Sequence, residues 1–464
     1  MRTDSFSLFH LYPHQGALLL FMSLFKHRTS SQTQASKNKP SRPLHLSTAW
    51  IIIVLVAAGL GVLIYRSSAK ILKAPIHSSV AVDDPVFRDS VGPLLSAEFV
   101  GGNTVRPLIN GKEIFPAMLE EIRKAKKSIT LESYIWASGE VGDQFRDALI
   151  ERAKAGVKVH ALVDGAGNLK LKLSDVEQMK AAGAEFVVYG REHWYQLKAD
   201  INHRSHRKLL IIDGKVGFTG GVCIDDTWLG DADREDRWRD TQARVEGPAV
   251  RQMQAVFATN WLQTTSRLLL GPDYFPDTGR PGSARVDCFK SGPNESPENA
   301  RMSYLLAIAA ARKSIRLSHA YFVPDDLAIE MLLSARKRGV KIEVVVPQKN
   351  DSRFGRAASR SRWGKLLEAG VEFHQFTPSM YHCKVMIVDD VFTTLGSVNF
   401  DNRSFSINDE VNINIIDAAV ARDFLKSFND DVAHSKPLTR EDFEGRPFYI
   451  KALDHICGAF RSQF

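Results

Sequence analysis

The sequence has few cysteines. Its cysteines lie far apart and form no CxxC pair, which argues against a cysteine-based zinc site. Their even number permits disulfides without indicating any. The four are Cys223, Cys288, Cys383 and Cys457.

The greater part of the chain also lacks the basic surplus that is typical of a nucleic-acid enzyme. The formal charge is +8, but residues 1–75 hold nine basic side chains against one acid, Asp4. The remainder carries 52 basic and 52 acidic residues. We therefore expect no nucleic-acid partner, and the basic N-terminal part fits attraction to anionic lipid.

Long apolar runs are also scarce, and one stands out. Thr48–Tyr65 spans 18 residues without a charge, about 27 Å as a helix, and has Trp50 and Tyr65 near its ends. We predict a single uncleaved transmembrane anchor at 48–65, after a disordered leader at 1–47 rich in Ser, Lys, Gln and Pro.

A buried core helix and a cleaved signal peptide are the alternatives for this run. Flanking Arg42 and Arg66 oppose the first, and the long leader opposes the second. More basic residues precede the run than follow it, which favours an external (periplasmic) catalytic part. Met22 is a second candidate start, because a polar, basic leader follows it.

Two halves of the remaining chain repeat one pattern. Lys127-Ser128-Ile129-Thr130-Leu131 and Lys313-Ser314-Ile315-Arg316-Leu317 each follow a helical stretch. A helix, a glycine and a β-branched run come next in both halves, at 155–163 and 338–346. This pattern predicts an α/β fold of two duplicated lobes, 98–285 and 286–464, related by a pseudo-two-fold axis. Gly271–Pro297 is expected to connect them, with a ligand site between them.

Each half contains the same motif, H-x-K-x(4)-D. It comprises His206, Lys208 and Asp213 in the first lobe, and His382, Lys384 and Asp389 in the second. On a strand, residues two apart point to one face, so each histidine is expected to share a site with its lysine. A structural role at the end of the strand is an equal alternative for the two aspartates.

Small residues follow both motifs at the same spacing. Gly220-Gly221 and Gly396-Ser397 belong to turns that begin thirteen residues after each histidine. We expect the backbone to approach a ligand closely there. A single H-x-K-x(4)-D motif would be weak evidence for a functional site. Two such motifs at equivalent positions of a duplicated unit are strong evidence.

The paired motifs are similar to those of the phospholipase D superfamily. The residues in and around the motifs resemble those of bacterial cardiolipin synthases more closely still. The resemblance covers about residues 98–450. It includes Leu131-Glu132-Ser133-Tyr134-Ile135-Trp136 and Gly396-Ser397-Val398-Asn399-Phe400-Asp401-Asn402-Arg403-Ser404. It implies a bacterial inner-membrane phosphatidyltransferase that acts on anionic phospholipids, phosphatidylglycerol and cardiolipin, and that uses no cofactor or metal.

The resemblance also implies the roles of the site residues. His206 is assigned as nucleophile and His382 as general acid/base, although the symmetry leaves a swap open. Lys208, Lys384 and Asn399, with Ser397 and Gly221, are expected at the phosphate. Glu410 is expected to orient His382, and Asp240 is expected to orient His206.

One departure from the family pattern is Cys223, which stands where the first copy usually has the counterpart of Asn399. Cys383 is expected to be an inert filler that faces away from the site. A hydrolytic phospholipase D, a nuclease and an inactive membrane scaffold are the competing interpretations. The neutral folded part opposes a nuclease, and the two intact motifs oppose a scaffold.

Overall fold

A computed structural model describes residues 72–190 and 203–459. The predicted leader, the anchor at 48–65 and the candidate start at Met22 lie outside these residues. Within the described ranges, no helix has both the length and the apolar character needed to cross a membrane.

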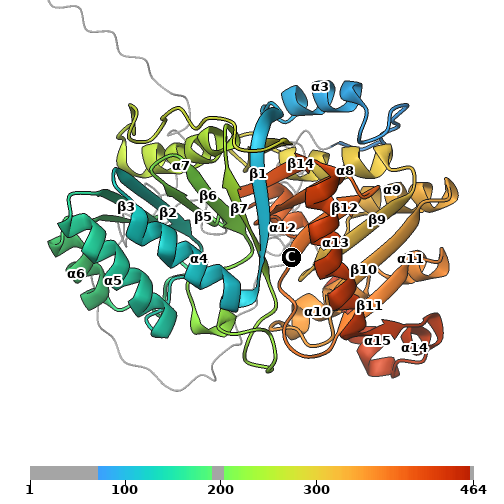
Figure 1. Cartoon of the computed structure of the whole chain (residues 1–464). Helices are drawn as coiled ribbons and strands as arrows, with labels where there is room; N and C mark the ends of the chain where they lie inside the picture. The colour runs from blue at the N-terminus through green and yellow to red at the C-terminus, as the bar shows by residue number, and fades with distance from the viewer. Residues whose placement is uncertain (1–71, 191–202, 460–464) are drawn as a thin grey trace, which may run out of the picture. The chain divides into compact units, whose positions relative to one another are not determined.

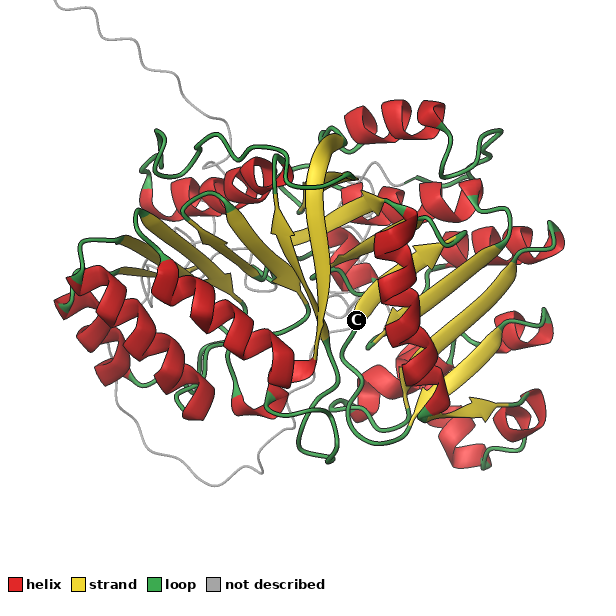
Figure 2. Cartoon of the chain, in the orientation of Figure 1, coloured by secondary structure: helices red, strands yellow, loops and turns green. Residues whose placement is uncertain are grey.

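The described strands form one mixed sheet with helices packed against it (Figures 1 and 2), and the order of its strands reveals the duplication. From the central strands outward, the first lobe runs β1-β7-β6-β5-β2-β3-β4 and the second runs β8-β14-β13-β12-β9-β10-β11-β15. The first seven strands correspond in order, and the pairings β2–β3–β4 and β9–β10–β11 are parallel in both lobes. The predicted α/β class with two duplicated lobes is confirmed.

The strands are β1 (Val100–Ile109), β2 (Ser128–Ser133), β3 (Lys158–Asp164), β4 (Glu185–Tyr189), β5 (Leu209–Ile212), β6 (Val216–Gly220), β7 (Thr241–Glu246), β8 (Ala284–Ser291), β9 (Ser314–His319), β10 (Lys341–Pro347), β11 (Glu372–Phe376), β12 (Lys384–Val388), β13 (Phe392–Gly396), β14 (Glu410–Ile416) and β15 (Ser435–Leu438).

The helices are α3 (Pro85–Leu94), α4 (Asn110–Lys124), α5 (Glu140–Lys154), α6 (Leu173–Ala181), the 3-10 turn η2 (Asp226–Trp228), α7 (Ala249–Thr265), α8 (Asn299–Ala310), α9 (Asp326–Lys337), α10 (Arg353–Arg360), α11 (Gly364–Glu368), α12 (Asn402–Ser406), α13 (Ala418–Ala433), α14 (Arg440–Glu444) and α15 (Phe448–Ala459).

Local sequence explains the α/β units. The motif strands β5 and β12 are short apolar runs, and they and their neighbours β2 and β9 are buried along nearly their whole length. Gly156 and Gly339 follow α5 and α9 with φ of 84° and 88°. This left-handed conformation suits glycine at the end of a helix, so both predicted turns are confirmed.

Two expectations about boundaries need correction. The expected connector Gly271–Pro297 contains β8, a central strand that pairs with β1 and β14, so the lobes are joined through the sheet itself. The ordered chain also begins before residue 98. Phe87 and Val91 of α3 lie in the core of the second lobe beside α8.

A shared apolar core lies where the lobes meet. It brings Leu209 and Ile211 of β5 together with Val385 and Ile387 of β12. Each motif strand is therefore fixed from behind by packing that both lobes contribute. This packing holds the residues at the start of the two strands in a fixed relation to one another.

Candidate active site

His206 lies just before β5, and its ring is fixed on two sides. Nδ1 lies 3.0 Å from each carboxylate oxygen of Glu410, which belongs to β14 of the other lobe. Tyr134, directly after β2, packs edge-on against the imidazole at 5.1 Å between ring centroids. Within the described residues, no hydrogen bond engages Nε2 of His206.

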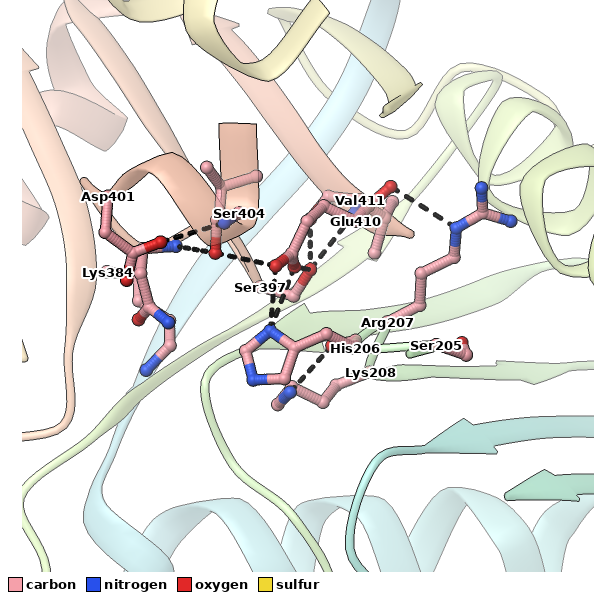
Figure 3. Close-up of polar contacts among 12 residues, drawn as sticks. Ser205, His206, Arg207, Lys208, Lys384, Ser397, Asp401, Ser404, Glu410 and Val411 are labelled. Carbon is pink, nitrogen blue, oxygen red and sulfur yellow. Dashed lines mark hydrogen bonds and ion pairs between the residues drawn. The ribbon is translucent and has the colours of Figure 1, made fainter. Parts of the chain in front are cut away.

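The Glu410 carboxylate is itself held by two hydroxyl groups (Figure 3). Ser404 Oγ donates to one oxygen at 2.7 Å, and Ser397 Oγ donates to the other. Glu410 is completely buried. A buried anion with these donors has one orientation, and it transmits that orientation to His206.

His382 lies just before β12 in the equivalent arrangement. Nδ1 is 2.8 Å from Asp240 Oδ2, and Asp240 comes from the first lobe. The indole nitrogen of Trp228 donates to the same oxygen at 3.0 Å. Trp228 and Trp238 both contact the His382 ring, with centroid distances of 5.3 and 5.2 Å.

The orienting carboxylates are therefore exchanged between the lobes. The expectation that Glu410 serves His382 and Asp240 serves His206 is wrong. The exchange is made by backbone contacts: His206 N–H donates to Asp409 C=O at 2.9 Å, and His382 N–H donates to Arg239 C=O at 2.7 Å. Each histidine loop pairs with the loop that carries its carboxylate.

Burial keeps both imidazoles neutral near pH 7. It lowers the pKa of His206 to about 4, assisted by the charges of Lys208 and Lys384 and opposed by Glu410. The pKa of His382 is lowered by the same causes, burial first and then Lys384, against the effect of Asp240. With Nδ1–H donating to a carboxylate, each neutral ring carries its lone pair on Nε2.

The two motif lysines point into the site between the lobes. Lys208 Nζ donates to the backbone oxygen of His206 at 2.7 Å and lies over the Tyr134 ring. Lys384 Nζ donates to the backbone oxygen of His382 at 2.6 Å and lies 3.2 Å from His382 Nε2. Burial lowers the pKa of Lys384 to about 8. Each ammonium keeps N–H donors for a bound anion.

Asn399 is one of the residues expected at a phosphate, where its amide N–H groups would be the donors. It is buried, and its side-chain oxygen has no hydrogen-bond partner in the described part of the chain. Ser397 and Gly221 instead support the orienting carboxylates. The Ser397 hydroxyl donates to Glu410, and a Cβ at Gly221 would collide with the Asp240 carboxylate. The backbone does approach another group closely here, as predicted, but at Gly221 that group is the Asp240 side chain and not a ligand.

Asp213 and Asp389 occupy the far ends of β5 and β12 from the histidines. The carboxylate of Asp213 accepts backbone N–H groups from Lys126, Lys127 and Ser128. Asp389 accepts from the three equivalent residues, 312–314. This is the structural alternative, and it corrects the assignment of these two aspartates to the catalytic set.

The cysteines are free and buried. Cys383 faces the shared core, 3.6 Å from Thr241 Oγ1, and burial raises its pKa to about 12, as expected of an inert filler. Cys223 lines a small cavity beside Lys208, so the departure from the family pattern lies at the site.

Sequence reasoning missed Ser404, Trp228 and Tyr134 as site residues. One signal was available: Trp228 and Ser404 both lie 22 residues after their motif histidines. Both donate to an orienting carboxylate. The equivalence is hard to recognise from sequence, because an indole and a hydroxymethyl side chain have nothing in common except a group that donates a hydrogen bond.

The family model described as "Cardiolipin synthase, PLD-like domain" matches residues 118–261 and 304–432, one segment in each lobe. The chain belongs to this family. It is 34% identical over 397 residues to a cardiolipin synthase of Geobacillus kaustophilus (strain HTA426), covering 84% of this chain and 79% of the relative. It is 34% identical over 362 residues to the major cardiolipin synthase ClsA of Bacillus subtilis (strain 168), covering 78% and 75%.

The solved structures to which this chain is similar include a phosphatidylserine synthase of Haemophilus influenzae Rd KW20, with a TM-score of 0.61. That match covers 82% of this chain and 100% of the other at 15% identity, so it supports the fold alone. The PLD-like family membership agrees with the duplicated α/β lobes and the paired motifs described above.

Proposed function

We propose that the protein is a cardiolipin synthase that transfers a phosphatidyl group from one phosphatidylglycerol to another and releases glycerol. The observation that carries the proposal is the exchanged pair of histidine–carboxylate contacts, His206–Glu410 and His382–Asp240. Two neutral imidazoles with fixed Nδ1 atoms can divide nucleophilic attack and proton transfer between them.

In the first half-reaction, Nε2 of His206 attacks phosphorus and forms an N–P bond. His382 takes up a proton at Nε2 as the anionic substrate binds, and Asp240 at Nδ1 stabilises the resulting imidazolium. The P–O bond to the glycerol headgroup then breaks, and the glycerol oxygen takes this proton from Nε2 of His382. Nε2 of His206 has no hydrogen-bond partner within the described ranges, whereas Nε2 of His382 lies 3.2 Å from Lys384 Nζ. This difference favours His206 as the nucleophile.

In the second half-reaction, His382 Nε2 removes the proton from a hydroxyl of a second phosphatidylglycerol. The resulting oxygen attacks phosphorus, the N–P bond breaks, and His206 is restored as a neutral imidazole. The products are cardiolipin and glycerol, and His382 ends protonated, ready for the next cycle.

Lys208, Lys384 and Asn399 stabilise the charge on the non-bridging phosphate oxygens. The two ammonium groups are anchored by the carbonyls of their own motif histidines, so little reorganisation accompanies the reaction. A phosphodiester monoanion gains charge on these oxygens as the bond to the nucleophile forms.

The same proposal places the enzyme at the bacterial cell membrane, held by the apolar segment 48–65 with the catalytic part outside. The support is the charge-free run of 18 residues and the basic surplus before it. The substrates would then be the anionic lipids of that membrane.

The direct test is product analysis with the full chain in mild detergent and headgroup-labelled phosphatidylglycerol. Cardiolipin and free labelled glycerol in equal amounts are expected. Phosphatidic acid without cardiolipin would replace the synthase with a hydrolase. His206→Ala and His382→Ala should each abolish turnover, and substantial residual activity in either variant would refute the assignment.

A further inference from the structure

The C-terminal helix α15 presents its apolar side outward. Phe448 and Tyr449 are 84% and 72% exposed, and Leu453 and Ile456 are exposed beside them. The charged residue Asp454 points inward, where it pairs with Arg360 at 2.8 Å and Arg446 at 2.5 Å. A helix that buries its acid and exposes aromatic and aliphatic side chains has, within the described residues, no partner for that face.

This face is linked to the active site through α10. Cys457 of α15 packs on Ala357 and Ala358 of α10, and the two helices lie together at the lower right of Figure 1. Just before α10, Asp351 accepts a hydrogen bond from Tyr321 at 2.6 Å. The Tyr321 ring in turn contacts that of His382, 6.3 Å between centroids.

The first lobe has an exposed apolar segment in the place equivalent to α10, because it follows β3 as α10 follows β10. The segment Leu169-Lys170-Leu171-Lys172-Leu173 follows β3, and Leu169 and Leu173 are 80% and 70% exposed. The residues just before this segment are fixed next to His206. Asp164, which ends β3, accepts from the Ser205 N–H at 2.9 Å, and Gly167 packs against the backbone of Tyr134.

Basic side chains accompany the apolar ones in both places. Lys170 and Lys172 alternate with the leucines, Arg353 precedes the exposed Phe354 of α10, and Lys451 lies on the exposed side of α15. Among the described residues, the ion pair of Lys170 is a 3.4 Å contact with Asp225. Exposed leucine and aromatic residues beside lysine and arginine match an anionic lipid surface, which offers an apolar layer below a negative one.

We infer that these two patches, residues 169–173 and the exposed side of α10 and α15, dock the catalytic part on an anionic phospholipid surface with the active site between them. The inference rests on the proposed function, because a substrate with two acyl chains must reach His206 and His382 from a membrane. The predicted anchor would tether the enzyme, whereas the patches would orient it.

The test uses the full chain with one introduced cysteine carrying an environment-sensitive fluorophore, since the four native cysteines are buried. The labelled positions are Leu169→Cys and Tyr449→Cys. Leu94→Cys is the matched control, an exposed leucine on α3. Figure 1 shows α3 at the top and α15 at the lower right. Vesicles contain phosphatidylcholine with phosphatidylglycerol and a nitroxide-labelled lipid.

Strong quenching at positions 169 and 449 and weak quenching at 94 is the expected result. Lys170→Gln with Lys172→Gln should remove most of the difference between vesicles with and without phosphatidylglycerol. Uniformly weak or uniformly strong quenching would overturn the inference. Fluorophores that quench each other between copies without lipid would assign the surface to a second copy of the chain, which also overturns it.

Activity enters only as a second readout, so failure of the proposed reaction leaves the docking result interpretable. Tyr449→Glu should lower turnover on vesicles about tenfold, because a charge replaces an apolar contact with lipid. Turnover on a short-chain, monomeric phosphatidylglycerol should be unchanged. Leu94→Glu should change neither.

Discussion

His206 and His382 show how burial and one contact set the protonation state of a side chain. Both rings lie inside the protein beside lysines, so both are neutral at pH 7, and the carboxylate at Nδ1 decides which nitrogen carries the hydrogen. The supports differ: two serine hydroxyls hold Glu410, whereas an indole and a backbone N–H hold Asp240. This asymmetry separates two otherwise equivalent residues.

His319 provides a prediction on pH and stability. It is fully buried between Tyr304 and Phe400, and neither ring nitrogen has a partner among the described residues. Burial, with Lys384, lowers its pKa from 6.5 to about 3. The unfolded chain therefore takes up the proton first, and stability falls as pH drops from about 6.5 towards 3.

His319→Phe should remove this component, about 2 kcal/mol at pH 5. The measurement is the denaturation midpoint against pH for wild type and variant, with exposed His77→Phe as control. Parallel wild-type and His319→Phe curves between pH 7 and pH 5 would show that His319 titrates normally.

At the scale of the element, Asp213 and Asp389 join each motif strand to its neighbour. Each accepts three backbone N–H groups at the start of β2 or β9, and their φ values are 52° and 53°. Aspartate tolerates this left-handed conformation better than most residues. The conserved spacing within the chain's own repeat thus reflects strand pairing and not proton transfer.

We predict that Asp213→Ala lowers the free energy of unfolding by about 2–3 kcal/mol, because three backbone N–H groups lose a charged acceptor. The turnover number per folded molecule should stay near wild type.

Asp240→Asn should have the opposite effects: little change in stability, and a loss of turnover of 100-fold or more, in the general range for lost orienting groups. Denaturant titration and active-site-normalised kinetics separate the two effects; a catalytic collapse in folded Asp213→Ala would contradict the structural role.

The strand β8 explains why one element was misread from sequence. Its flanks are rich in Gly and Pro, which favoured a connector, yet Ala284–Ser291 is buried at six of its eight positions. The Gly and Pro residues correctly indicated turns on either side. The strand between these turns is recognised only from its pairing with β1 and β14.

At the scale of the whole molecule, the lobes are tied by a buried ion pair behind the site. Arg239 of the first lobe donates to both oxygens of Asp431 on α13, at 2.7 and 2.9 Å. Tyr381 donates to the same carboxylate at 2.8 Å. Since Arg239 and Tyr381 precede Asp240 and His382, the pair fixes the relative position of both.

Asp431→Leu should destabilise the protein by about 3–5 kcal/mol, because it leaves the Arg239 charge buried and unpaired. Arg239→Met combined with Asp431→Leu should recover much of that loss while turnover stays low. Urea titration and kinetics of the three proteins test this; equal stability of the single variant and wild type would show that the ion pair does not hold the lobes together.

The repeat, the two motifs and the identity of all four orienting and nucleophilic side chains could be predicted from sequence. The partnership of His206 with Glu410 could not, because it depends on how two lobes pack and both pairings satisfy the same residue types. For the same reason, Ser397 and Gly221 were placed at the phosphate: a small residue in a glycine turn indicates close approach without naming what approaches.

The proposed mechanism requires a phosphatidyl group that is carried on His206, and trapping this intermediate tests the mechanism at its decisive step. A phosphatidyl ester of p-nitrophenol needs no acid for its leaving group, so His382→Ala should release one equivalent of nitrophenol and stop. Mass spectrometry should then find the phosphatidyl group on the peptide containing His206, and His206→Ala should give no release. A burst from His206→Ala with the label on His382, or turnover with no labelled histidine in either variant, would contradict the account.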